Sequence, residues 1–228
     1  MSKPLVIITG ASSGIGAAIA KIFSDAGFPL GLLSRNKEAM EKLNLPNTIC
    51  LSADVTEMNA LENAIQIAEN NFGPVNCLIN NAGFAKGGDF TKLTHDDHLN
   101  TVNINLIGVI NGIEIVLPGM RERKTGTIIN ISSVADRHPR PNIAAYAATK
   151  AAIKSLSESL RVANAKYGIR VCNLAPAKIK TPMLMSAGLN DNQIIPAEDF
   201  AKAVLWVYQQ PQTICVRDMV FAPTYYEP

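Results

Sequence analysis

Short apolar segments alternate with longer amphipathic segments along almost the whole sequence. Most of the short segments are apolar without interruption, which is typical of strands that are covered on both faces of a parallel sheet. The expected strands are Leu5–Thr9, Leu30–Ser34, Thr48–Ser52, Cys77–Asn80, Thr127–Ser132, Arg170–Leu174 and Ile214–Phe221. The expected helices, in which apolar residues recur at helical spacing, are Ile15–Ala26, Met58–Asn71, His95–Arg121, Ala144–Tyr167 and Pro196–Tyr208. The alternation predicts an α/β fold, a doubly wound and mostly parallel sheet of seven strands with helices on both faces.

The chain has 228 residues, a length that one α/β domain commonly has, so we expect a single domain over residues 1–228. Its net charge of +2 gives no electrostatic reason to expect nucleic acid or an acidic membrane as a partner. No apolar run reaches the ~18–20 residues of a membrane span, and the first strand begins at Leu5, so we expect a cytoplasmic protein. The four cysteines lack metal-site spacing and are expected to be reduced. The irregular segment 178–195 is predicted to be a substrate loop.

A glycine-rich turn joins the first expected strand to the first expected helix, and it reads Thr9-Gly10-Ala11-Ser12-Ser13-Gly14-Ile15-Gly16. Small residues let the backbone approach a pyrophosphate closely, and the N–H groups at the helix start face its negative charge. Turns use glycine without any ligand as well, but the position after an N-terminal strand favours a phosphate site. The first candidate cofactor-binding residues are therefore Gly10, Ser12, Ser13, Gly14, Ile15 and Gly16.

The second expected strand leads into Ser34 and Arg35, about 20 residues beyond the glycine turn. Dinucleotide sites carry at this distance an acidic residue for a ribose 2′-hydroxyl, or a cation for a 2′-phosphate. The sequence has no Asp or Glu here, whereas the Arg35 guanidinium can form a paired, charge-assisted contact with a phosphate and Lys37 lies close by. We therefore predict NADP rather than NAD as the cofactor. The alternative is that Arg35 is an ordinary solvated cation.

Tyr146 and Lys150 are four residues apart near the start of an expected helix, so they share a helical face. A free phenol titrates near pH ~10, and a nearby cation lowers that pKa toward the range needed for proton exchange at neutral pH. Such a pair also occurs by chance on helix surfaces. Ser132 and Ser133 end the fifth expected strand, at the rim where ligands bind in open α/β sheets. A serine there could hold a carbonyl oxygen beside the phenol.

These motifs, in this order and spacing, resemble those of the short-chain dehydrogenase/reductase family over about Lys3 to Ala222. The glycine motif of the family corresponds to Thr9 to Gly16, and its serine, which lies 13 residues before the tyrosine, selects Ser133 over Ser132. Further matches are Asp54 and Val55 on the adenine side, Asn80, Asn81, Ala82 and Gly83 after the fourth strand, Asn105 as the catalytic asparagine, and Tyr146 with Lys150.

The resemblance implies a Rossmann fold and a role for each catalytic residue. Tyr146 would exchange the proton, and Lys150 would lower the pKa of Tyr146 and bind the nicotinamide ribose. Ser133 would orient the substrate oxygen, and Asn105 would hold a water that relays protons to Lys150. Pro176 and Ala177 stand where the family has Pro-Gly, and Ile179 and Thr181 match its positions for holding the carboxamide.

Asp136 is a second departure, because many members have glycine at this position, and it is followed by Arg137, His138 and Arg140. These cations give the hypothesis of an anionic substrate, with a solvent-facing loop as the alternative. His95 and His98 have metal-like spacing but no nearby third ligand, so we expect no metal site.

We therefore expect an NADP(H)-dependent oxidoreductase that transfers a hydride between nicotinamide and a carbonyl or alcohol, with Tyr146 as the general acid/base. The alternative is a non-catalytic dinucleotide-binding sensor or scaffold on the same fold. The small-molecule substrate stays open among a 3-hydroxy acid, a simple aldehyde or ketone, and a polyol. The resemblance also implies a homo-oligomer, a tetramer or dimer, formed through the helices His95–Arg121 and Ala144–Tyr167.

Overall fold

The structure, a computed structural model, describes residues 3–182 and 193–225. Its centre is one seven-stranded sheet in the order β3-β2-β1-β4-β5-β6-β7, in which every neighbouring pair of strands is parallel. The strands are β1 (Leu5–Thr9), β2 (Leu30–Ser34), β3 (Thr48–Ser52), β4 (Val75–Asn80), β5 (Gly126–Ile131), β6 (Ile169–Pro176) and β7 (Asp218–Phe221). The predicted doubly wound α/β fold is confirmed.

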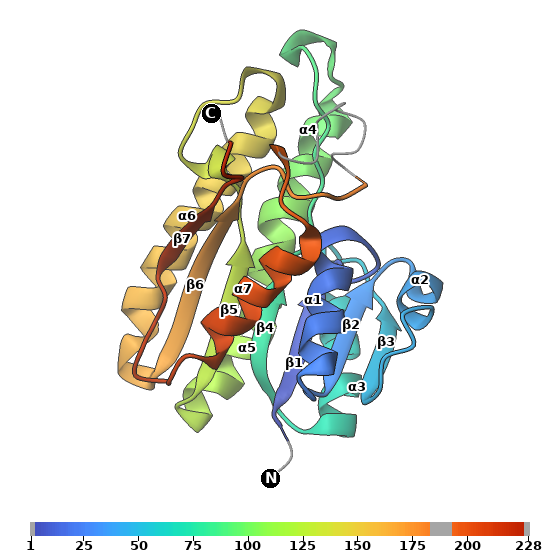
Figure 1. Ribbon diagram of the computed structural model, residues 1–228, viewed down its shortest axis with the longest axis vertical. Helices are drawn as coiled ribbons and strands as arrows, with labels where there is room; N and C mark the ends of the chain where they lie inside the picture. Colours follow the sequence, from blue (N-terminus) through green and yellow to red (C-terminus); the bar gives the residue numbers. More distant parts are fainter. Residues whose placement is uncertain (1–2, 183–192, 226–228) are drawn as a thin grey trace.

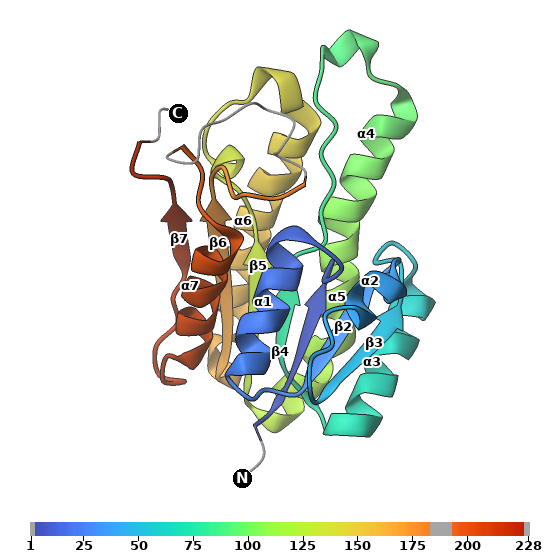
Figure 2. The same cartoon turned by 45° about the vertical axis from the view of Figure 1, so that its right-hand side comes forward.

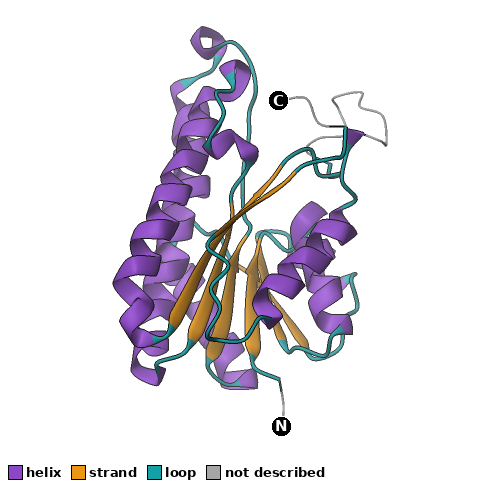
Figure 3. Cartoon of the chain, turned by 60° about the vertical axis from the view of Figure 1, so that its left-hand side comes forward, coloured by secondary structure: helices purple, strands orange, loops and turns teal. Residues whose placement is uncertain are grey.

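Helices cover both faces of the sheet, α1 and α7 on one and α3, α5 and α6 on the other (Figures 1 and 3). The helices are α1 (Gly14–Asp25), α2 (Lys37–Glu41), α3 (Met58–Phe72), α4 (His95–Val102), α5 (Gly108–Arg123), α6 (Ala144–Asn164) and α7 (Ala197–Gln209). Short helical turns are η1 (Phe90–Lys92), η2 (Asn103–Ile107, a π turn), η3 (Val134–Asp136), η4 (Pro141–Ile143) and η5 (Ala165–Tyr167).

The core consists of two apolar clusters that the sheet separates. Successive residues of β1 point to opposite faces because side chains alternate along a strand. Val6 and Ile8 pack with α1 and α7, whereas Leu5 and Ile7 pack with α3, α5 and α6. All four side chains are at most 1% exposed, which explains why the run in the sequence is continuously apolar.

The strand order reverses between β1 and β4, which lie side by side at the centre of the sheet (Figure 2). From β1 the chain moves outward through β2 and β3, and from β4 it moves outward on the other side to β7. The loops that follow β1 and β4 therefore diverge at their carboxyl ends. In open α/β sheets such a crevice is where ligands bind.

Besides shifts of one or two residues at the ends of β4, β5 and β6, three features of the fold differ from the expectation. β7 pairs with β6 only over Asp218–Phe221, so the predicted strand Ile214–Phe221 begins four residues too early. The five-residue helix α2 was not expected. The helix predicted over His95–Arg121 is continuous to Arg123 but contains a π turn at Asn103–Ile107.

This continuous helix, His95–Arg123, is long and apolar enough by length and composition to cross a membrane. Its inner residues Val109, Ile113 and Val116 belong to the cluster that lies against α3 and the sheet. Packing of these residues in the core therefore accounts for the apolar character of the helix.

Candidate active site

The turn after β1 requires glycine at three positions, because of its backbone conformation and its close contacts. Gly10 and Gly14 have φ values of +65° and +53°, in the left-handed region that residues with a Cβ rarely adopt. A Cβ on Gly16 would overlap the carbonyl oxygen of Gly10 and lie 2.6 Å from Nδ2 of Asn81. The three glycines thus let the turn fold tightly against the loop that follows β4.

Thr9 and Asn81 join the glycine turn to the end of β4. The Thr9 hydroxyl accepts hydrogen bonds from the backbone N–H groups of Asn81 (3.0 Å) and Ala82 (3.1 Å). The Asn81 amide donates to the carbonyl oxygens of Thr9 and Gly10, both at 3.1 Å. The Asn81 side chain therefore lines the crevice and also holds the glycine turn next to the end of β4.

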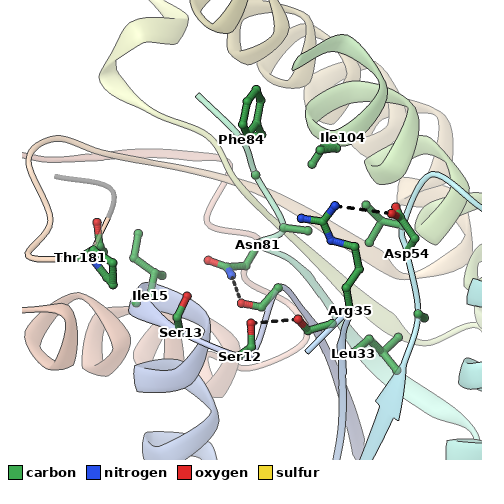
Figure 4. Close-up of a pocket in the computed structure, with 18 residues that line it drawn as sticks. Ser12, Ser13, Ile15, Leu33, Arg35, Asp54, Asn81, Phe84, Ile104 and Thr181 are labelled. Atoms are coloured by element: carbon green, nitrogen blue, oxygen red, sulfur yellow. Dashed lines mark hydrogen bonds and ion pairs between the residues drawn. The ribbon is translucent and has the colours of Figure 1, made fainter. Parts of the chain in front are cut away.

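A cavity of about 310 Å³ lies in this crevice, at the carboxyl ends of the central strands (Figure 4). Thirteen of its 18 lining residues are predicted cofactor-binding residues: Gly10, Ser12, Ser13, Gly14, Ile15, Ser34, Arg35, Asp54, Val55, Asn81, Ala82, Gly83 and Thr181. The structure thus brings together segments that follow β1, β2, β3, β4 and β6.

Five lining residues were not predicted: Leu33, Ala53, Phe84, Ile104 and Pro182. Each is the sequence neighbour of a predicted residue, as Leu33 is of Ser34 and Ile104 is of Asn105. They are apolar, and apolar residues at strand ends look like core residues in a sequence. Their adjacency to motif residues was the one available signal.

One end of the cavity carries the predicted phosphate-selecting residues. Oγ of Ser34 donates a hydrogen bond of 2.9 Å to Oγ of Ser12, which joins β2 to the glycine turn. The Arg35 side chain is 73% exposed, and its Nη1 lies 3.9 Å from Oδ2 of Asp54 (Figure 4). A separate hollow adjoins this end and is lined by Ser12, Ser34, Arg35, Asn36, Lys37 and Glu38.

Tyr146, Ser133 and Lys150 meet where β5 ends and α6 begins. The Ser133 hydroxyl lies close enough to the Tyr146 phenol to lower its pKa, whereas Ser132 is buried and donates to Asp136 at 2.9 Å. Nζ of Lys150 lies 5.5 Å from the centre of the Tyr146 ring. The geometry therefore pairs Ser133, rather than Ser132, with the phenol.

The pKa values of these groups are governed first by burial. Burial raises the pKa of the Tyr146 phenol above its usual value, and the hydrogen bond with Ser133 opposes that rise. Burial lowers the pKa of Lys150 to about 8, because an ammonium loses its water there. The expected lowering of the Tyr146 pKa by Lys150 is thus not found: burial is the largest cause of the shift, and it raises the pKa.

The ammonium of Lys150 has one donor engaged with the main chain, a 2.8 Å hydrogen bond to the carbonyl oxygen of Ile131 at the end of β5. A Cβ placed on Gly83, which lines the cavity, would lie 4.0 Å from Nζ of Lys150. Lys150 therefore stands directly behind the cavity wall, next to the phenol.

Asn105 lies in the π turn and is completely buried. Its Oδ1 accepts from the N–H of Phe84 (2.7 Å), and its Nδ2 donates to the carbonyl oxygen of Phe84 (2.8 Å) and to Oγ1 of Thr149 (3.2 Å). The side chain therefore holds Phe84 and joins the loop after β4 to α6, and its role in holding a water stays a prediction.

Five remaining cofactor candidates do not line this cavity: Gly16, Tyr146, Lys150, Pro176 and Ala177. A sixth, Ile179, pairs with Ile195 in an isolated bridge. The Ala177 N–H donates to the carbonyl oxygen of Phe221 at 2.7 Å. Thr181 lies over Gly14, where a Cβ would come within 3.1 Å of its methyl group. Residues 183–192 of the predicted substrate loop lie outside the described residues.

The hypothesis of an anionic substrate loses its central residue, because Arg137 is paired with two carboxylates. It contacts Asp136 at 2.5 Å and Asp218 at 2.8 Å. His98 stacks on Phe90 with ring centres 4.5 Å apart. Within residues 3–182 and 193–225, no group of three or more His, Cys, Asp or Glu could hold a metal ion, and all four cysteines are free thiols.

The chain belongs to the short-chain dehydrogenase family, whose model matches residues 4–192. An uncharacterized oxidoreductase of Staphylococcus epidermidis is 30% identical over 227 residues, and the match covers 98% of each chain.

Among solved structures, the serine dehydrogenase of Escherichia coli is 27% identical, with a TM-score of 0.87 over 98% of this chain and 100% of that one. A 3-ketoacyl-(acyl-carrier-protein) reductase from Brucella melitensis, complexed with NADH, is 27% identical, with a TM-score of 0.89 over 95% of this chain and 96% of that one. The protein is therefore an oxidoreductase of this family.

Proposed function

We propose that the protein is an NADP(H)-dependent oxidoreductase that interconverts a carbonyl group and an alcohol of a small molecule. The observation that carries this proposal is the grouping of Ser133 and Tyr146 with Lys150, whose ammonium lies behind Gly83 at the wall of a cavity built on a glycine turn. A binding protein without catalysis would have no need for a phenol, a hydroxyl and a buried ammonium together at this point.

The residues around the cavity fit a dinucleotide. Gly10, Gly14 and Gly16 form a cradle from which Cβ atoms are excluded by backbone conformation or by contact. The backbone at the start of α1 opens into the same cavity through Ser13, Gly14 and Ile15, where unpaired N–H groups attract phosphate. Asp54 and Val55 would border the adenosine half of the cofactor, and Thr181 would border the nicotinamide half.

The preference for NADP rests on the hollow beside Ser12 and Ser34. Two hydroxyls and the cations Arg35 and Lys37 line it, against the single carboxylate of Glu38. A 2′-phosphate accepts hydrogen bonds from hydroxyls and paired ones from a guanidinium. The carboxylate of Asp54 is engaged by the N–H and hydroxyl of Thr56, at 2.9 and 2.8 Å.

When bound, the nicotinamide cofactor supplies or accepts the hydride. The chain contributes the proton chemistry: Tyr146 gives a proton to the substrate oxygen as the carbonyl is reduced, and takes one in the opposite direction. Ser133 holds the same oxygen by a hydrogen bond next to the phenol. Lys150, with its positive charge, stabilises the phenolate that remains after the proton has left.

Exposed apolar residues support a second part of the proposal, that copies of the chain associate as a dimer or tetramer. Leu99, Val102 and Ile107 on the long helix and Val162 on α6 are 37–61% exposed. Burial of such side chains between copies is favourable.

The direct test combines calorimetry with an NADPH-oxidation screen over aldehydes, ketones, keto acids and ketoses. We expect NADPH to bind at least ~10-fold more tightly than NADH, since a charged phosphate contact contributes about 1.5–3 kcal/mol, and at least one carbonyl class to be reduced. Equal affinities would overturn the NADP assignment. Tight NADPH binding without turnover of any class would instead favour a sensor or scaffold.

A further inference from the structure

A carboxylate without exposed surface lies next to the catalytic hydroxyls. Asp136 is the last residue of η3, the short turn whose N-cap is Ser133, and its side chain is 0% exposed. The hydroxyl of Ser133 accepts a hydrogen bond of 3.2 Å from the N–H of Ala135 within this turn. A buried carboxylate is costly unless it is paired and hydrogen-bonded, so the partners of Asp136 reveal what holds it.

Three side chains donate to this carboxylate. Oδ2 of Asp136 accepts from Ser132 Oγ (2.9 Å), Asn173 Nδ2 (3.0 Å) and Arg137 Nη2 (3.0 Å), and Oδ1 accepts from Arg137 Nε (2.5 Å). These partners come from the end of β5, from β6 and from the turn itself. These hydrogen bonds therefore fix the carboxylate in one position.

A second carboxylate completes the network from β7. Arg137 also donates to Asp218 through Nη1 (3.0 Å) and Nη2 (2.8 Å), and Asn173 donates to Oδ1 of Asp218 (2.9 Å). Asp218 is 35% exposed in its side chain and lies 4.0 Å from Nζ of Lys154. The turn that carries Ser133 is thus attached to the last three strands of the sheet.

The charge of Asp136 acts on the two titratable groups that face the site from α6. After burial, it is the charged group that raises the pKa of Tyr146, and it opposes the burial-driven fall of the pKa of Lys150. Both effects have the sign expected of a nearby negative charge. The other charged groups of this network are Arg137 and Asp218, and Lys154 on α6 lies 4.0 Å from Asp218.

On the basis of the proposed function, we propose that Asp136 is a positioning residue: it fixes the Ser133 turn and places a buried negative charge close to the site that Tyr146 and Lys150 share. It acts through Ser132 and the turn, and it touches neither substrate nor cofactor in this role.

The test is the variant Asp136→Asn in the full chain, with Asp218→Asn as the matched control and Asp136→Glu as the charge-preserving variant. The Tyr146 titration is read by NMR from protein labelled at the tyrosine ring carbon next to oxygen, with the signal assigned by its loss in Tyr146→Phe. We expect the midpoint in Asp136→Asn to fall by about one pH unit. Asp218→Asn should titrate as the wild type does, and Asp136→Glu should remain closer to the wild type than Asp136→Asn.

The thermal midpoint and the NADPH affinity of each variant report folding and cofactor binding separately. An unchanged Tyr146 midpoint in folded Asp136→Asn would overturn the electrostatic role, whatever the loss of stability. Equal shifts of the Tyr146 midpoint in Asp136→Asn and Asp218→Asn would overturn the role of Asp136 and assign the effect to Arg137, which pairs with both carboxylates. Because the titration needs no turnover, an inactive wild-type protein would refute the proposed function and leave this result readable.

Where a carbonyl substrate is found, the pH profile of reduction gives a second readout. The alkaline limb of kcat should move to lower pH in Asp136→Asn, because reduction needs the phenol, while KM for NADPH stays within about twofold of the wild-type value. A uniform fall of kcat at every pH would indicate a structural role alone.

Discussion

The ammonium of Lys150 donates a 2.8 Å hydrogen bond to the carbonyl oxygen of Ile131, which joins α6 to the end of β5 beside Tyr146. The same strand end continues into Ser132 and Ser133. One buried cation thus fixes the distance between the strand that carries the serine and the helix that carries the tyrosine. The arrangement is built into the fold and does not depend on a flexible loop.

This buried ammonium gives the first prediction, on stability. Lys150 has a pKa of about 8 in the folded protein and 10.5 as its ordinary value, so between these pH values the unfolded chain binds more protons than the folded one. The free energy of unfolding therefore gains a contribution that rises with pH through this window and is constant below it. In urea titrations, the stability difference between Lys150→Met and the wild type should shift by about 1–3 kcal/mol in favour of the wild type across the window. A difference independent of pH would contradict the lowered pKa.

The second prediction concerns cofactor preference. Arg35→Asp places a carboxylate where the 2′-phosphate would bind, so NADPH affinity should fall by at least ~30-fold while NADH affinity changes little or improves. Lys21→Asp is the matched control, because Lys21 is an exposed cation that pairs with Asp25 on α1 and does not line the cavity. Calorimetry with both cofactors measures the ratio, and an unchanged ratio in Arg35→Asp would remove Arg35 from the site.

The third prediction tests the glycine cradle. Gly16→Ala would press a methyl group onto the Gly10 carbonyl, whereas Gly87→Ala would meet its neighbours at an ordinary 3.4 Å. We expect Gly16→Ala to lower the free energy of unfolding by about 3 kcal/mol and Gly87→Ala to change it by less than ~0.5 kcal/mol. Urea denaturation measures the free energy of unfolding of both variants. Equal values would mean that the turn shifts to accept the methyl group at no cost, against this prediction.

The alternation of apolar runs was sufficient to predict the doubly wound sheet, because strands covered on both faces must be apolar throughout. The same rule misplaced the start of β7. Residues 214–217 are apolar enough for a strand, but the guanidinium of Arg170 holds the carbonyl oxygens of Gln210 (2.7 Å) and Ile214 (3.4 Å). The carbonyl oxygen of Ile214 is thus engaged by a side chain of β6, and the N–H of Ile214 donates to the carbonyl oxygen of Pro211 at 2.8 Å. Regular pairing therefore begins only at Asp218.

The candidate site was predictable where a backbone conformation or a polar group marks the residue type. Gly10 and Gly14 adopt positive φ values, which favour glycine, so the residue type itself indicates the turn. Ser34 and Arg35 are polar residues at the end of a strand, which indicates a ligand site. Phe84 and Ile104 carry no such mark. Arg137 shows the limit most clearly, since its partner Asp218 stands 81 residues later in the chain, and only the fold brings the two charges together.

The last prediction addresses the central claim, that Tyr146 handles the proton. Tyr146→Phe removes one hydroxyl and keeps the ring, so turnover of the best carbonyl substrate should fall by about 10²–10⁴-fold while NADPH affinity stays within about threefold. Tyr167→Phe is the matched control, because Tyr167 lies in η5 between α6 and β6, beyond the cavity, and should leave both values unchanged. The measurement is kcat with saturating NADPH together with the calorimetric Kd in the same preparation. The account predicts lost turnover with retained binding in Tyr146→Phe, and full turnover in that variant would contradict it.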